Sequence, residues 1–185
     1  MVKPHKAIRN LALAALLLGG PALFAQTANG TINATLINKS GLTLVFDTDA
    51  GGVALGANGS SAASAGFGII SAFGPLAGGV TRPSVGPATF TVQTLFDVNV
   101  IEGGLASANY TLTANLAAAA ATGMSYKVDA VTLTTAAQTI QVNGTYNTDV
   151  PHSLGLVVSM SAPGAGGPNV GFPITATINF TATAN

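Results

Sequence analysis

Few side chains in this sequence have types and spacing that could support chemistry. His152 is the only histidine beyond residue 25, and no cysteine is available as a nucleophile or a soft metal ligand. Because His152 follows Pro151 at the start of an apolar run, we expect it to be a surface residue and not a catalyst. The sequence contains no Gly-x-Ser-x-Gly elbow and no phosphate-binding loop. We therefore expect no catalytic residue, no cofactor and no enzymatic activity.

The carboxylates show no metal-binding pattern either. Asp47 and Asp49 resemble the start of a calcium loop, but the twelfth position is Asn58, where such a loop needs a glutamate. Asp97 and Glu102 flank the end of an apolar stretch and show no pairing signal. We expect a plain turn after Asp47 and no metal site.

The first 25 residues have the three-part layout of a secretory signal peptide. Lys3, Lys6 and Arg9 form a positive start, residues 11–18 are apolar, and the segment ends at Ala25. The apolar run is too short to span a bilayer comfortably. We expect residues 1–25 to be removed, so that contact with a membrane is limited to export, and residues 26–185 to form a single domain.

Removal of this segment changes the charge of the protein. The whole chain has six bases and six acids, and its formal net charge is zero. Beyond residue 25 the bases are only Lys39, Arg82 and Lys127, whereas all six acids remain. The mature chain is therefore weakly acidic and nearly free of charge. This composition excludes a basic surface for nucleic acid and favours packing beside copies of the same protein.

Alternation of apolar and polar residues with period two predicts an all-β protein. In residues 107–116 and 174–182 every second side chain is apolar, and those between are Thr, Ser or Asn. Successive side chains of a strand point to opposite faces, so this pattern is typical of half-buried strands. The spacing favours an immunoglobulin-like β-sandwich of about seven to nine strands with long loops at 50–66 and 74–87. Further strands are predicted at residues 31–38, 42–46, 67–73, 88–101, 124–128, 131–134, 139–142 and 153–160.

The two ends of the mature chain have distinctive alternating sequences. The start reads Asn29-Gly30-Thr31-Ile32 and continues as an alternating strand. It is similar to the opening of chaperone–usher fimbrial subunits. The finish, Ala176-Thr177-Ile178-Asn179-Phe180 and onward, looks like the final strand of these pilins, and Gly171 stands about where the family has a glycine. The chain lacks the early cysteine pair of many pilins, and Ala184 replaces their penultimate tyrosine.

This resemblance implies a pilin-like sandwich that lacks its last strand. The missing strand leaves an apolar groove, which the N-terminal extension of the next subunit fills. The donor would be residues 26–37, with Ile32, Ala34 and Leu36 pointing into the groove. The residues implied on the acceptor and terminal strand are Gly171, Ile174, Ala176, Ile178 and Phe180. The implied partners are copies of the chain or related subunits, together with a periplasmic chaperone and an usher.

We therefore expect a secreted bacterial structural protein of the cell surface or an extracellular fibre, contributing to adhesion. The alternatives are a self-contained secreted sandwich of a surface layer or matrix, in which residues 31–37 form its own first strand, and an outer-membrane β-barrel. The barrel needs aromatic girdles, and the chain has three tyrosines and no tryptophan. Rows of threonine such as Thr181 and Thr183 are also compatible with an ice- or sugar-binding face.

Overall fold

The computed structural model describes residues 41–160 and 175–185. The expected signal peptide and the donor candidates Ile32, Ala34 and Leu36 lie outside the described residues. The same is true of Gly171 and Ile174.

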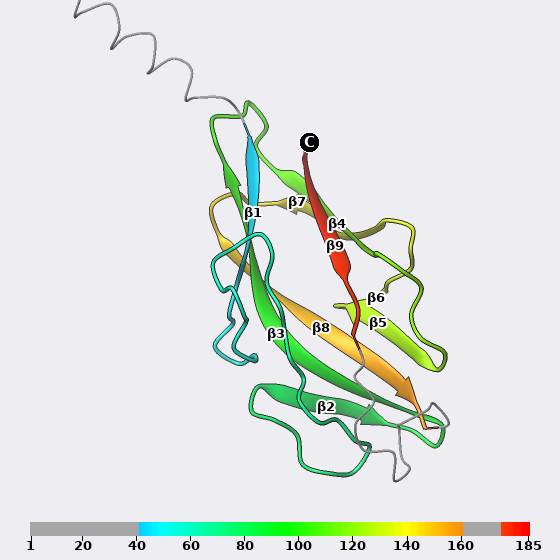
Figure 1. Cartoon of the computed structure of the whole chain (residues 1–185). Helices are drawn as coiled ribbons and strands as arrows, with labels where there is room; N and C mark the ends of the chain where they lie inside the picture. The colour runs from blue at the N-terminus through cyan, green and yellow to red at the C-terminus, as the bar shows by residue number, and fades with distance from the viewer. Residues whose placement is uncertain (1–40, 161–174) are drawn as a thin grey trace, which may run out of the picture. The chain divides into compact units, whose positions relative to one another are not determined.

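The described residues form nine β-strands and no helix, so the all-β prediction is confirmed (Figure 1). The strands are β1 (Leu42–Asp47), β2 (Val80–Val85), β3 (Thr89–Glu102), β4 (Tyr110–Leu116), β5 (Met124–Val128), β6 (Val131–Thr132), β7 (Gln138–Gly144), β8 (Asp149–Ser159) and β9 (Ile178–Ala184).

The strands build two antiparallel sheets. The larger sheet has the order β1-β3-β8-β5-β6. Strand β2 pairs with the first half of β3, on the same edge of β3 as β1. The smaller sheet has the order β7-β4-β9. Side chains from both sheets share one hydrophobic core, which makes the fold a β-sandwich.

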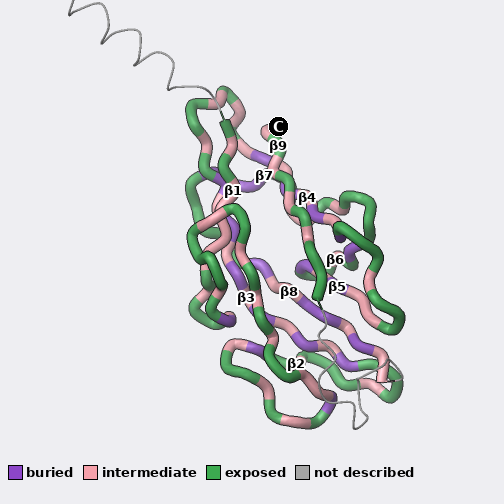
Figure 2. Tube along the Cα trace, viewed as in Figure 1, coloured by how far each residue is buried: buried purple, intermediate pink, exposed green. Residues whose placement is uncertain are grey.

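Alternating sequence explains why β3 and β4 are central. All inward side chains of β3 from Phe90 to Val100 are buried, as are those of β4 from Tyr110 to Leu116. Their neighbours along each strand are half-buried, mostly threonine or asparagine. Figure 2 shows this as purple segments that recur along β3, β8 and β4. Apolar faces of the two sheets therefore meet, as the period of two predicts.

Two predictions about the chain between β1 and β3 are wrong. Residues 67–73, predicted as a strand, have no regular structure; Gly68 takes a φ of +64°, which an extended strand does not tolerate. Conversely, β2 lies within the predicted long loop 74–87. It accommodates Pro83 because it is an edge strand whose register shifts between Thr81 and Ser84.

Candidate functional site: an apolar groove beside β9

An open groove lies between the two sheets at the start of β9. Its volume is about 630 Å³, and its walls come from β1, β3, β5, β8, the chain before β2, and residues 175–180. The large apolar side chains along it include Phe46, Phe67, Phe96, Tyr126, Leu156 and Phe180. The described residues therefore leave the sandwich incompletely filled on this side.

Three phenylalanines from three strands form an aromatic cluster in the groove. The ring centroids of Phe46 and Phe180 are 5.2 Å apart, and Phe96 lies 6.2 Å from Phe46 and 5.9 Å from Phe180. The edge-to-face geometry of Phe180 with the other two rings is a favourable one for aromatic pairs. Phe46 and Phe180 remain only half-buried although they pack against the core. An apolar side chain entering the groove would cover them.

Strand β9 presents a free backbone edge next to this groove. It pairs with β4 on one side, and within the described residues its other side pairs with no strand (Figure 1). The Asn185 amide donates to the Asn109 carbonyl (3.1 Å), and the Ala117 amide donates to the Thr177 carbonyl (2.9 Å). These bonds fix the register, in which the odd-numbered residues of β9 bond to β4.

The even-numbered residues of β9 consequently direct their N–H and C=O groups away from β4. Their side chains are all apolar and half-buried, whereas those of the odd-numbered residues are exposed. The even-numbered residues of β9 are Ile178, Phe180, Ala182 and Ala184. The same four residues therefore offer backbone groups that no described strand pairs with, together with apolar side chains on the inner face. An added strand needs this arrangement.

The sequence-predicted acceptor residues that can be placed lie at this groove. Ala176, Ile178 and Phe180 line it, with Ala176 just before β9 begins. Sequence reasoning did not identify Phe46, Phe96 or the wall formed by residues 61–67. No signal in the sequence pointed to that wall, because residues 50–66 have almost no bulky side chain.

His152 is buried, and the prediction that it lies on the surface is wrong. Its side chain is 4% exposed, because it pairs across the strands with Phe96 on the inner face of β8. The two ring centroids are 5.9 Å apart, so His152 adjoins the aromatic cluster through Phe96.

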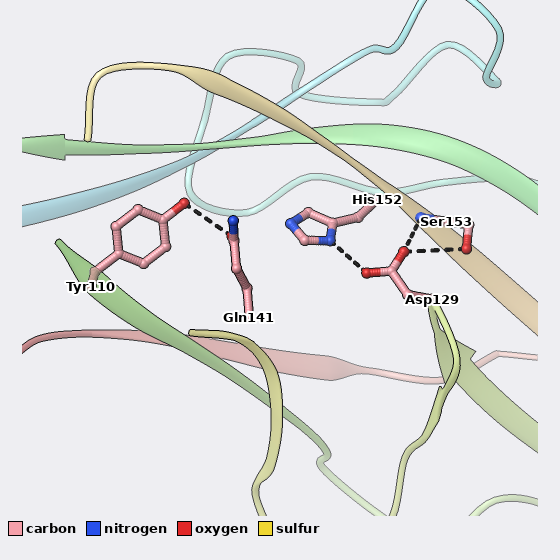
Figure 3. A network of polar contacts seen from close by, with 5 residues as sticks. All are labelled: Tyr110, Asp129, Gln141, His152 and Ser153. Atoms are coloured by element: carbon pink, nitrogen blue, oxygen red, sulfur yellow. Dashed lines mark hydrogen bonds and ion pairs between the residues drawn. The ribbon is translucent and has the colours of Figure 1, made fainter. Parts of the chain in front are cut away.

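A carboxylate holds the buried imidazole in place (Figure 3). His152 Nδ1 lies 2.8 Å from Asp129 Oδ2, and Asp129 Oδ1 accepts a bond from the Ser153 amide at 2.8 Å. The Ser153 hydroxyl contacts this carboxylate and not the imidazole, which differs from a nucleophile–base pair. His152 Nε2 has no partner among the described residues. The pair ties β8 to the turn between β5 and β6 and is a structural contact.

Carboxylates meet on the larger sheet at the end of β1. Asp97 pairs across the strands with Asp47, and burial, followed by the charges of Asp49, Asp149 and Asp47, raises the pKa of Asp97 above its usual value of 3.8. Asp49 instead completes a turn, in which its Oδ1 accepts from the Gly51 amide at 2.6 Å. Within residues 41–160 and 175–185 no three side chains form a group that could hold a metal ion.

We expect Asp97→Asn to stabilise the protein at neutral pH by about 0.5 kcal/mol, a value kept small by solvent screening. A raised native pKa means that the folded state binds the proton more tightly than the unfolded state. Stability from this group is therefore full below the ordinary pKa and is lost as pH rises through the native pKa. Urea unfolding at pH 7 and at pH 3 checks this: the gain should be present at pH 7 and absent at pH 3. An equal difference at both pH values would contradict the electrostatic cause.

In the described part of the chain no helix is long and apolar enough to cross a membrane. No protein-family model matches the chain, and neither the curated proteins nor the solved structures include a significant match.

Proposed function

We propose that this chain is a secreted bacterial structural surface protein, a fimbrial-type subunit that assembles by β-strand donation and contributes to adhesion. The observation that carries the proposal is that the apolar groove lies beside the edge of β9 that no described strand pairs with. Residues 26–37 of one copy enter the groove of the next copy and pair with β9. Ile32, Ala34 and Leu36 then cover the half-buried phenylalanines.

Binding of the donated strand in the groove is expected to be favourable. Burial of a side chain such as isoleucine or leucine contributes about 1.5–3 kcal/mol, and each new main-chain hydrogen bond adds about 1 kcal/mol. Head-to-tail donation uses two different surfaces of each copy and does not close, so it generates a fibre. A periplasmic chaperone would protect the groove until an usher presents the next subunit.

The sparse charge of the domain supports contacts between copies. The described residues contain two bases, Arg82 and Lys127, against six acids. Few charged groups must therefore lose their hydration when one copy covers another.

Deletion of residues 26–37 from the mature chain tests the proposal. We expect the shortened chain to fold as a monomer that forms no filaments in electron microscopy, whereas the intact mature chain forms them. A peptide of residues 26–37 should bind the shortened chain, and the same peptide with Ala34→Asp should not, since it places a charge in the apolar groove.

Two outcomes would contradict strand donation. A shortened chain that is unfolded even with the peptide present would show that residues 26–37 belong to the fold of their own copy. An intact mature chain that stays monomeric in size-exclusion chromatography would favour a self-contained sandwich.

A further inference from the structure

Two large apolar side chains stand in solvent on the chain that leads from the groove to β2. Ile69 is 78% exposed and Phe73 is 83% exposed. The segment around them is held by specific contacts. Ala72 between them is buried, the Gly74 amide donates to the Ser71 hydroxyl at 2.7 Å, and Arg82 Nη2 donates to the Gly74 carbonyl at 2.6 Å. The exposure of Ile69 and Phe73 is therefore a built feature of the surface.

The segment itself carries no charged side chain. No charged residue occurs between Asp49 and Arg82, although the described part of the chain is acidic. Two acidic copies repel each other wherever their carboxylates approach. An uncharged segment with two apolar side chains is a surface on which a second copy can pack without that repulsion.

The segment also adjoins the groove at the end where β9 begins. Residues 61–65 and Phe67 line the groove together with residues 175–177, and Ile69 follows two positions after Phe67. The donor strand is expected to pair antiparallel with β9, because that pairing is the more stable one. The C-terminal end of the donor strand then leaves the groove where β9 begins. Only residues 38–41 then connect the donor strand to β1 of its own copy, a reach of about 13 Å. The body of the donor copy must therefore lie against this end of the acceptor.

The donor copy has an exposed apolar residue where this contact would fall. This residue is Ile101 of β3, which is 42% exposed. It pairs across the strands with Thr43, near the start of β1. The short connection brings that end of the donor copy toward the acceptor.

We propose that Ile69 and Phe73 of the acceptor copy pack against the β1-start end of the donor copy, including Ile101, and form a second contact between consecutive subunits. The partner is a second copy of this chain, and the inference rests on the proposed strand donation. Three exposed side chains bury too little area for a stable dimer, so the contact acts together with the donated strand.

The test compares filament formation by the intact mature chain and three variants. We expect Ile69→Ser/Phe73→Ser and Ile101→Ser to keep the wild-type melting temperature and to raise the concentration needed for filaments by about tenfold, equivalent to about 1.4 kcal/mol. Val142→Ser is the matched control, because Val142 is 61% exposed but lies on β7, which β4 separates from β9. This control should polymerise as the wild type does.

The outcomes separate the two proposals. Filaments that form at the wild-type concentration from the double variant overturn the second contact and leave strand donation intact. Failure of the wild type itself to form filaments overturns strand donation, and the second contact falls with it.

Discussion

Replacing Ala182 by proline is expected to abolish filament formation while the domain stays folded. The Ala182 amide points to the free edge of β9, so its loss breaks no bond to β4. A donated strand needs that amide, and the proline ring also obstructs its approach. Electron microscopy of the mature protein should show no filaments, and its thermal unfolding should remain cooperative.

The matched control places the proline one residue later, where the backbone amide is directed to β4 and not to the free edge. The Thr183 amide points to β4 and pairs with Thr111, so Thr183→Pro removes a bond within the smaller sheet. We expect this variant to lose about 3 kcal/mol of stability. Wild-type filaments from Ala182→Pro would show that assembly does not use the edge of β9.

The periodicity of the sequence was sufficient to predict the parts of the fold in which each strand has one buried face. In β4 the predicted apolar set from Tyr110 to Leu116 is the buried set, and the threonines between face outward. Alternation works there because every second position meets the same core. The terminal strand β9 was predicted for the same reason.

Features that depend on contacts between distant segments could not be predicted. Pro83 indicated a loop, but a strand tolerates it because only one side of β2 is paired. Phe67 and Ile70 suggested a strand, yet that chain packs irregularly against the core. His152 follows a proline at the start of an apolar run, which suggested a surface position, but its cross-strand register with Phe96 buries it.

The candidate site was accessible from the sequence only in part. The resemblance of the two termini to fimbrial subunits pointed to Ala176, Ile178 and Phe180, which line the groove. The opposite wall comes from β1 and β3, whose Phe46 and Phe96 approach Phe180 only after both sheets have formed. Chain positions this far apart carry no joint signal in a single sequence.

The segment that carries the wall residues 61–67 is flanked by a close stack of three backbone segments. Gly52 lies against the Leu95 backbone of β3, and Gly79 lies against Gly52. The Val53 amide fixes this stack by donating to the buried Thr94 hydroxyl at 2.8 Å. Any side chain at Gly52 or Gly79 would overlap backbone atoms that cannot rotate away.

Gly79→Ala is therefore expected to destabilise the protein by about 3 kcal/mol, through backbone overlap and through a φ of +78° that disfavours alanine. Gly78→Ala is the control, because a methyl group there meets no atom within 4 Å, and its effect should stay within about 0.5 kcal/mol. Denaturant unfolding of the mature protein measures both. Equal stability of the two variants would mean that the stack is not close-packed in solution. A large loss confined to Gly79→Ala would show that the chain before β2 is anchored on β3, which is the condition for residues 61–67 to serve as a firm wall of the groove.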